Sequence, residues 1–148
     1  MTPYQSILLV DDSDDDYEAT VRSLKKNNVM NPVHWCKNGQ DALNYLRNIG
    51  VHPPSATERL PSLILLDLNM PGIDGREVLS SIKADERLRG IPIVILTTSS
   101  DERDVNECYR IGASTYIQKP VTFEGLTDAI GALRHYWFDI AILPGHSR

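Results

Sequence analysis

The sequence predicts a doubly wound α/β domain, in which helices cover both faces of a parallel sheet of five strands. Three observations predict it: short apolar runs, helical hydrophobic periods between these runs, and helix-capping residues just ahead of the periods. A strand followed by a helix, repeated five times, implies right-handed crossovers and therefore a parallel sheet. The length of 148 residues suits one domain, so we expect a single domain over residues 1–148.

The strands are predicted from apolar runs that do not alternate with polar residues. Continuous runs of this kind are typical of parallel strands that are buried on both faces. The clear runs are residues 7–10, 63–66 and 91–96, and weaker runs occupy residues 33–36 and 115–117. Most of the clear runs end abruptly in polar residues.

The helices are predicted from apolar residues that recur with a helical spacing between these runs. Val105, Cys108 and Tyr109 form the fourth of five such stripes. A side chain that can accept from free backbone N–H groups precedes each stripe. These predicted N-terminal caps are Ser13, Asn38, Asp74, Ser100 and Thr122.

Two segments exceed the minimum for this fold. Residues 50–61 show no hydrophobic period and include consecutive prolines, so we predict a loop insertion there. Residues 139–148 form a C-terminal tail. The apolar residues that follow the predicted core are Phe138, Ile140, Ile142 and Leu143. They either pack back on their own domain or are buried against another chain, and the sequence leaves both readings open.

Charge and composition exclude several classes of protein. The 20 acidic and 15 basic residues give a net charge of −5, which disfavours binding to nucleic acid or to an anionic membrane. No apolar run approaches the roughly 20 residues that span a bilayer. Cys36 and Cys108 show neither a metal-like spacing nor a disulfide framework, which favours a reducing, cytoplasmic location.

Polar residues stand at the carboxyl ends of the predicted strands, where doubly wound sheets bind ligands. Asp11 and Asp12 follow the first strand, and Asp67 follows the third. Thr97 closes the fourth strand, and Lys119 follows the fifth. Because these ends meet at one edge of a parallel sheet, we expect the five residues to share a small cleft.

Three carboxylates and one ammonium group leave this cleft with excess negative charge. Two carboxylates about 4 Å apart repel by roughly 4 kcal/mol at an effective dielectric constant near 20. A hard divalent cation relieves this repulsion, and oxygen ligands without His or Cys favour Mg²⁺ over zinc. We expect Asp12 and Asp67 to ligate Mg²⁺, for which Mn²⁺ can substitute. Asp11 would support the site, and the backbone carbonyl of Asn69 would be a third protein ligand.

This set of groups favours phosphoryl transfer, with Asp67 as a carboxylate nucleophile that forms an acyl phosphate. Lys119 would pair with one phosphoryl oxygen, and Thr97 would donate a hydrogen bond to another. Positioning and charge neutralisation supply most of the catalysis in such transfers. The acidic residues 14–16 are interpreted as solvent-facing groups at a helix N-terminus, where the helix dipole favours anions.

The same residues resemble the receiver domain of two-component response regulators. The resemblance rests on Asp11-Asp12, on Leu66-Asp67-Leu-Asn-Met-Pro-Gly72, and on Thr97 and Lys119-Pro120, in the family's order and spacing. It covers about residues 6–138. It implies a flavodoxin-like sheet with strand order 2-1-3-4-5 and a cis Lys119-Pro120 peptide bond.

The resemblance also implies a role for each site residue. Asp67 would accept a phosphoryl group from a phosphohistidine of a partner kinase, which makes the protein a signalling switch rather than an enzyme. Tyr116 matches the switch aromatic, which turns inward when Thr97 moves toward the phosphate. Asn69 and Ser99 match positions that tune hydrolysis of the phosphoaspartate.

A finer resemblance is to single-domain regulators that serve bacterial phytochromes. It rests on the loop at 50–61, Asp74-Gly-Arg-Glu-Val-Leu79, Leu96-Thr-Thr-Ser99 and the aromatic segment Tyr136-Trp-Phe138. It implies a stand-alone regulator whose partner is a phytochrome histidine kinase. It further implies a homodimer through the fourth helix, the fifth strand and the fifth helix.

Two other functions use a similar fold. A magnesium-dependent phosphohydrolase of the haloacid-dehalogenase type also has an aspartate nucleophile, but it needs a second aspartate two residues later, where Asn69 stands. A flavodoxin-like electron carrier needs a hydroxyl-rich phosphate cradle after the first strand, where Asp11 and Asp12 would repel an anion. The phosphohydrolase is kept as the alternative to the signalling switch.

Overall fold

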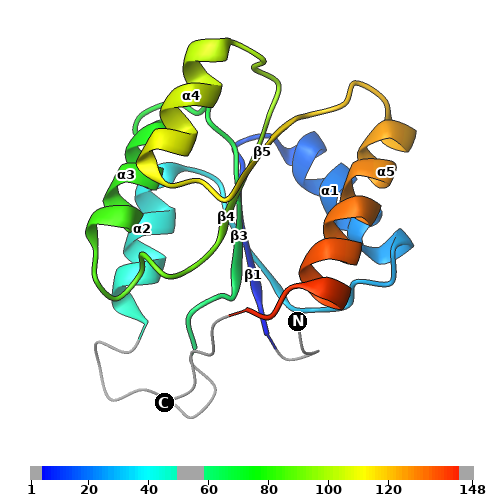
Figure 1. Cartoon of the computed structure of the whole chain (residues 1–148), viewed down its shortest axis with the longest axis horizontal. Coiled ribbons are helices and arrows are strands. Elements are labelled where there is room, and N and C mark those ends of the chain that lie inside the picture. The colour runs from blue at the N-terminus through cyan, green and yellow to red at the C-terminus, as the bar shows by residue number, and fades with distance from the viewer. Residues whose placement is uncertain (1–4, 50–58, 144–148) are drawn as a thin grey trace.

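A five-stranded parallel sheet lies between two layers of helices (Figure 1). The computed structural model describes residues 5–49 and 59–143, so most of the predicted loop and the end of the tail lie outside the described residues. The sheet order is β2-β1-β3-β4-β5, which confirms the order that the family resemblance implied. The strands are β1 (Ile7–Val10), β2 (Val33–Cys36), β3 (Leu63–Leu66), β4 (Ile93–Thr97) and β5 (Thr115–Gln118).

Helices cover both faces of the sheet, as predicted. In Figure 1, α1 and α5 lie on one face and α2, α3 and α4 on the other. A short π-helical segment, η1, continues α5. The bounds are α1 (Asp14–Lys26), α2 (Gly39–Asn48), α3 (Gly75–Ala84), α4 (Glu102–Ile111), α5 (Phe123–Arg134) and η1 (His135–Ile140).

Four of the five predicted helix caps are confirmed. The side chains of Ser13, Asn38, Asp74 and Thr122 each accept a hydrogen bond from a backbone N–H in the first turn. The fifth prediction was wrong by one residue, because Asp101 rather than Ser100 caps α4 and accepts from the N–H of Arg103 at 2.9 Å. Both residues are good caps, but a carboxylate also interacts favourably with the positive end of the helix dipole.

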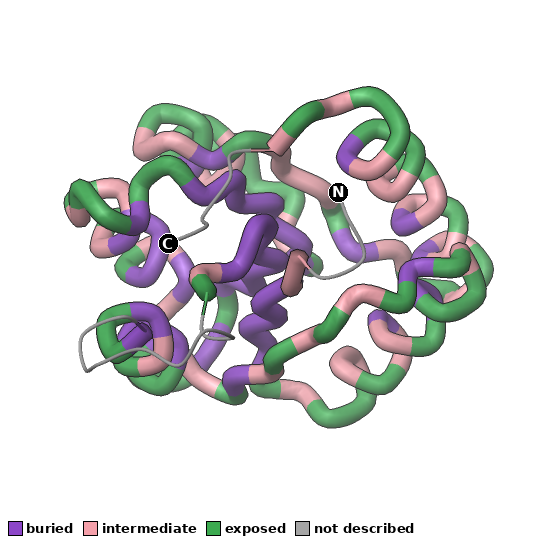
Figure 2. Tube along the Cα trace, turned by 90° about the horizontal axis from the view of Figure 1, so that it is seen from below, coloured by how far each residue is buried: buried purple, intermediate pink, exposed green. Residues whose placement is uncertain are grey.

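The core lies on both faces of the sheet, and its density falls toward β5. Every residue of β1, β3 and β4 is buried, whereas β5 is half-buried or exposed. Figure 2 shows the buried residues concentrated in the centre of the molecule and the exposed residues on the outer turns of the helices. Helix α4 buries only Cys108, although Val105 and Tyr109 share its predicted apolar stripe.

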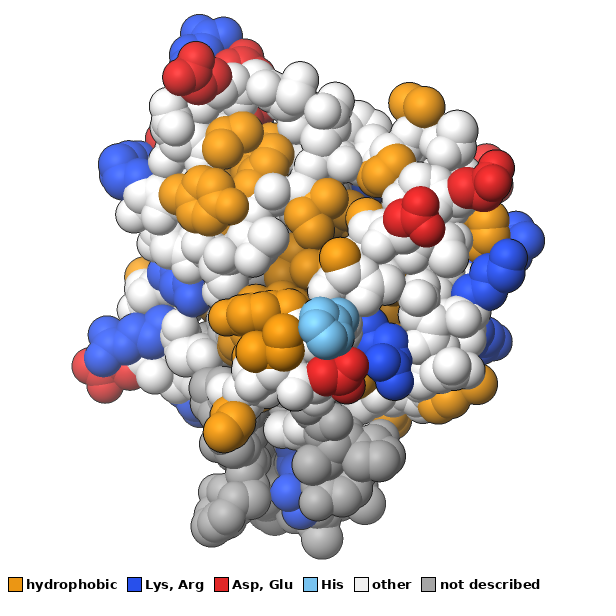
Figure 3. Space-filling view, turned by 45° about the vertical axis from the view of Figure 1, so that its right-hand side comes forward, with side chains coloured by type: hydrophobic (Ala, Val, Ile, Leu, Met, Phe, Trp, Pro, Cys, Tyr) orange, Lys and Arg blue, Asp and Glu red, His pale blue; other side chains and the backbone are white. Residues whose placement is uncertain are grey.

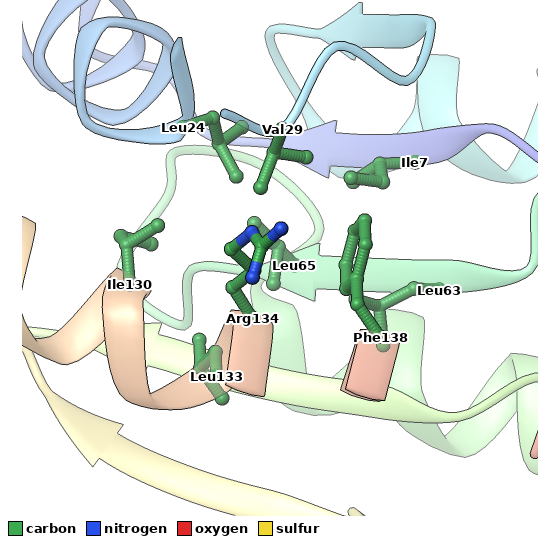
Figure 4. A pocket seen from close by; sticks show the side chains of 9 residues that line it. All are labelled: Ile7, Leu24, Val29, Leu63, Leu65, Ile130, Leu133, Arg134 and Phe138. Atoms are coloured by element: carbon green, nitrogen blue, oxygen red, sulfur yellow. The ribbon is translucent and has the colours of Figure 1, made fainter. Parts of the chain in front are cut away.

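Two of the four apolar residues near the C-terminus follow the first of the two readings, packing back on their own domain. Phe138 and Leu143 pack against the core layer beneath α1 and α5. Figure 4 shows Phe138 beside Ile7 and Leu63, where these side chains line a small apolar pocket. Ile140 and Ile142 are 58% and 97% exposed, so these two side chains do not pack back on their own domain.

One expectation from the resemblance was wrong. The described residues contain no cis peptide bond, so the Lys119-Pro120 bond is trans, the form that X–Pro bonds favour by about 0.5–1 kcal/mol. Among the same residues, no helix combines the length and the apolar character that crossing a bilayer requires.

Candidate functional site

Hydrogen bonds between neighbouring strands place the site residues at one edge of the sheet. The backbone N–H groups of Asp11 and Asp67 donate to carbonyl oxygens of adjacent strands at 3.2 and 3.0 Å. The N–H of Lys119 donates to the carbonyl of Thr97 at 2.5 Å. The ladder therefore continues one residue beyond β1, β3 and β5 and fixes the backbone of Asp11, Asp67 and Lys119.

The structure brings the three predicted acidic residues together. Oxygen atoms of Asp11, Asp12 and Asp67 all lie within 4.8 Å of one another. Asp11 and Asp67 are buried, with exposed fractions of 2% and 8%, whereas Asp12 is exposed. The three carboxylates therefore offer only oxygen ligands, and a cation could reach them from solvent on the side of Asp12.

Lys119 is buried against the acidic residues. Its Nζ atom donates to Asp11 Oδ2 at 2.9 Å and lies 4.0 Å from Asp67 Oδ2. Burial alone would lower the pKa of Lys119, but the surrounding carboxylates outweigh burial and raise it above its usual range. The side chain is therefore a permanent cation at neutral pH.

One cation does not neutralise the buried acids. Burial raises the pKa of Asp67, although Lys119, the Thr97 hydroxyl and the N–H groups of Asn69 and Leu68 offset part of this effect. Burial also raises the pKa of Asp11, and the N–H of Ser13 and the Lys119 ammonium oppose it. Burial therefore disfavours the charged forms of both carboxylates, and a bound divalent cation would favour them.

Thr97 contributes a buried hydroxyl that lacks a partner. Its Oγ1 atom makes no hydrogen bond to any described residue. The hydroxyl lies close enough to Asp67 to favour the charged carboxylate, but not in hydrogen-bonding geometry. Buried polar groups are rarely left unpaired. An unpaired donor beside Asp67 fits an oxygen of a group bound to that carboxylate.

The first helix supplies a fourth carboxylate that the sequence did not assign to the site. Lys119 Nζ donates to Asp16 Oδ2 at 2.9 Å. The interpretation of residues 14–16 as solvent-facing was therefore wrong for Asp16, whose side chain is 41% exposed. The only signal was its place three residues after the cap Ser13, which also indicates an ordinary capping residue.

Tyr116, the predicted switch aromatic, and Ser99, a predicted hydrolysis-tuning residue, belong to a polar network on the α4 side of the site. Tyr116 Oη donates to the carbonyl of Ser99 at 2.9 Å, and Ser99 Oγ donates to Asp104 Oδ2 at 2.7 Å. Asp104 in α4 also accepts from Arg76 in α3, at 2.5 Å from Nη2 and 3.2 Å from Nε. Asn69, in contrast, is exposed on the loop after Asp67.

Gly75 permits helix α3 to begin directly against the Asp67 loop. Its N–H donates to the carbonyl of Leu68 at 2.8 Å. A Cβ atom at this position would lie 2.2 Å from the carbonyl oxygen of Asp67 and 2.6 Å from Cα of Leu68. Any larger residue would therefore displace either the helix or the backbone that carries Asp67.

Comparison with known proteins identifies the family. The profile of the response regulator receiver domain matches residues 7–131. The chain belongs to the response regulator receiver family. Members of this family are signalling proteins that accept phosphoryl groups from histidine kinases, and the family assignment does not favour the phosphohydrolase.

Its relatives include regulators of similar length. The probable methanogenesis regulatory protein FilR2 of Methanothrix harundinacea is 37% identical over 94% of this chain and 87% of its own length. The response regulator Rcp1 of Synechocystis is 35% identical over 96% of this chain and 95% of its own. The receiver domain is also homologous to phytochrome response regulators, among them the cyanobacterial RcpA.

Solved structures agree with the fold and with a metal site. The phosphorylated cyanobacterial phytochrome response regulator RcpA superposes with a TM-score of 0.86 at 35% identity, covering 96% of this chain and 99% of that one. The Mn²⁺-bound form of Rcp1 gives 0.84 at 34% identity, covering 95% and 99%. The carboxylates of Asp11, Asp12 and Asp67 fit a divalent cation of this kind, because hard cations prefer oxygen ligands.

Proposed function

We propose that the protein is a stand-alone response regulator, in which Asp67 accepts a phosphoryl group from a histidine kinase with Mg²⁺ bound. The observation that carries this proposal is the convergence on one carboxylate of two further acids, a buried cation and an unpaired hydroxyl. Asp67 lies beside Asp11 and Asp12, 4.0 Å from Lys119 Nζ and close enough to the unpaired Thr97 hydroxyl for that group to favour the charged carboxylate. No other carboxylate among residues 5–49 and 59–143 combines these neighbours.

The chemistry is a substitution at phosphorus. A carboxylate oxygen of Asp67 attacks the phosphorus of phosphohistidine, a P–O bond forms, and the P–N bond breaks with its electron pair returning to the imidazole. Lys119 pairs with one phosphoryl oxygen and Thr97 donates to another, which gives its hydroxyl the missing partner. Hydrolysis later releases phosphate and restores the Asp67 carboxylate.

The cation would be held by Asp12 and Asp67, with Asp11 in support and the Asn69 carbonyl as a further ligand. Mg²⁺ supplies charge neutralisation for the phosphoryl oxygens when it is bound. Mn²⁺ is expected to substitute, since a homologous regulator has been solved with this ion. The side chains of Asn69 and Ser99 would tune hydrolysis of the phosphoaspartate. Both residues lie just after strands that position reacting groups, β3 with Asp67 and β4 with Thr97.

The signal would leave through α4, β5 and α5. Movement of Thr97 toward the phosphoryl group would pull on the β4–α4 loop, to which Tyr116 is tied through the Ser99 carbonyl. Exposed apolar residues flank this side of the molecule, and Figure 3 shows several hydrophobic side chains gathered on it. The exposed large apolar residues of α4, η1 and the segment after η1 are Tyr109, Tyr136, Ile140 and Ile142. A homodimer through this surface and the tail would bury them.

A phytochrome histidine kinase is the proposed partner, in the cytoplasm. Two homologues of nearly the same length, Rcp1 and RcpA, are 35% identical to this chain, and RcpA is a phytochrome response regulator. Transfer of labelled phosphate from a panel of purified kinases tests both parts of the proposal. We expect a phytochrome kinase to label the unsubstituted protein rapidly and to leave Asp67→Asn unlabelled. Labelling of Asp67→Asn would contradict the phosphoacceptor role, whereas preference for another kinase would contradict only the partner.

A further inference from the structure

Lys119 has a second anionic partner that phosphoryl binding does not require. Its Nζ atom is 2.9 Å from Asp16 Oδ2, the same distance as from Asp11 Oδ2, whereas Asp67 Oδ2 lies 4.0 Å away. Hydrogen bonds from nitrogen to oxygen are about 2.7–3.2 Å long. The ammonium group is therefore bonded to Asp11 and Asp16 and not to the proposed phosphoacceptor.

The way in which α1 begins frees Asp16 for this contact. Ser13 caps the helix, and its Oγ accepts from the N–H of Asp16 at 3.1 Å. An acidic side chain at this position commonly reaches back to the N–H of the capping residue. Here that N–H donates to Asp11 Oδ1 at 3.0 Å instead. Since the usual donor is already occupied, the carboxylate of Asp16 turns to Lys119.

Asp16 is the only acidic residue in the first turn of α1 that contacts Lys119 in the part of the chain that the structure describes. The Lys119 side chain is 7% exposed and that of Asp16 is 41% exposed, so Asp16 lies on the solvent side of the ammonium group. Asp14 pairs with Lys37, which follows β2 at the opposite end of the strand order from β5. Asp15 is exposed and forms no ion pair with any residue that the structure describes.

Phosphorylation would change the balance of charge around Lys119. An ammonium group has three N–H donors, of which Asp11 and Asp16 engage two. A phosphoryl group brings between one and a half and two negative charges. These charges attract Lys119 and are repelled by Asp16, so the phosphoryl group and Asp16 favour opposite positions of the ammonium group.

We propose that Asp16 is a positioning residue that competes with the phosphoryl group for Lys119 and thereby weakens phosphoryl binding. The inference rests on the proposed phosphoacceptor role of Asp67. Asp16 holds the ammonium group beside α1 in the resting protein and gives up part of this interaction when a phosphoryl oxygen enters. Loss of the Asp16 charge therefore favours the phosphorylated form.

Beryllofluoride, a phosphoryl mimic that needs no kinase, provides the test. It is titrated at saturating Mg²⁺ into the unsubstituted protein, Asp16→Asn and Asp15→Asn, and binding is followed by backbone amide shifts in NMR spectra. Asp15→Asn removes the same charge from the same helical turn. We expect Asp16→Asn to bind beryllofluoride about two- to fivefold more tightly than Asp15→Asn, the range for a partly exposed ion pair.

Each outcome decides the inference. Equal affinities of Asp16→Asn and Asp15→Asn would overturn it, and so would weaker binding by Asp16→Asn, because Asp16 would then orient Lys119 for the phosphoryl group. Asp16→Ala removes the hydrogen-bond acceptor as well as the charge. It is also expected to bind beryllofluoride tightly, a result that a merely structural role of Asp16 would not produce. Failure of the unsubstituted protein to bind beryllofluoride would instead contradict the proposed function of Asp67.

Discussion

The two sides of the functional edge are held in place by different forces. On one side, β3 is buried at every position and α3 buries Gly75, Val78, Leu79 and Ile82. On the other, β5 has no buried residue and α4 buries only Cys108. Apolar packing fixes the strand that carries Asp67, whereas polar contacts hold the segment that would respond to its phosphorylation.

The difference has an energetic meaning. Burying one large apolar side chain stabilises a fold by about 1.5–3 kcal/mol. A partly exposed ion pair or a single hydrogen bond contributes about 1 kcal/mol or less. Rearrangement of α4 and β5 therefore costs far less than rearrangement of β3, so the proposed phosphorylation of Asp67 would shift the α4–β5 surface without disturbing the site itself.

The largest effect expected from this contrast is in the strands themselves. Ile64 in β3 is fully buried, and Ile117 in β5 is only partly buried. Ile64→Ala should lower the free energy of unfolding by about 2–5 kcal/mol, and Ile117→Ala by less than half of that value. Urea denaturation measures both. Equal losses would show that β5 is packed as firmly as β3.

A second, smaller effect concerns the contact between α3 and the Asp67 loop. Gly75→Ala should cost about 1–3 kcal/mol, because its Cβ would collide with the backbone of Asp67 and Leu68. It should also reduce labelling by acetyl phosphate. Gly90→Ala is the matched control, since nothing lies within 4 Å of a Cβ there. A Gly75→Ala protein as stable as the control would contradict the close approach.

The side of the edge that carries Asp67 is well packed, but repulsion among its carboxylates is unfavourable without a cation. Asp12→Asn should raise the melting temperature of the metal-free protein by a few degrees, because it removes one of three mutually repelling carboxylates. Mg²⁺ should then stabilise the variant less than the unsubstituted protein. Thermal melts with and without Mg²⁺ give both values, with Asp15→Asn as the charge control. An unchanged metal-free melting temperature would argue against repulsion.

The smallest expected change lies in the polar network. Asp104→Asn should weaken the contacts with Arg76 and Ser99 and cost less than about 1 kcal/mol. Its effect should be local, with faster hydrogen exchange in α4 and unchanged exchange in β3. Glu107→Gln, which removes an exposed pair with Arg110, should leave both unaltered. Faster exchange in β3 would mean that the two sides are not energetically separate.

Sequence patterns were sufficient for the elements whose local signals agree with their surroundings. The runs at 7–10 and 63–66 match β1 and β3, because continuous apolar residues followed by an aspartate indicate both the strand and its end. The prediction at 91–96 began too early, since Pro92 has no N–H to donate to a sheet ladder. The convergence of Asp11, Asp12 and Asp67 followed from the topology of a parallel sheet.

Contacts between side chains distant in sequence were beyond such patterns. Asp16 and Lys119 belong to α1 and to the end of β5, and the sequence of α1 alone is equally compatible with a solvent-facing residue. The pair of Arg76 and Asp104 joins α3 to α4. The hydrophobic period shows which face of each helix is buried, but it does not show which polar side chains of the two helices meet. These contacts depend on rotamers and helix placement, which only the folded structure specifies.

The identity of the phosphorylated residue tests the central claim most directly. The protein is treated with acetyl phosphate and Mg²⁺, the acyl phosphate is reduced with borohydride to homoserine, and the modified position is found by peptide mass spectrometry. We predict modification at position 67 alone, and none when Mg²⁺ is chelated. Modification of another aspartate, or of none in Mg²⁺-loaded folded protein, would contradict the assignment of Asp67.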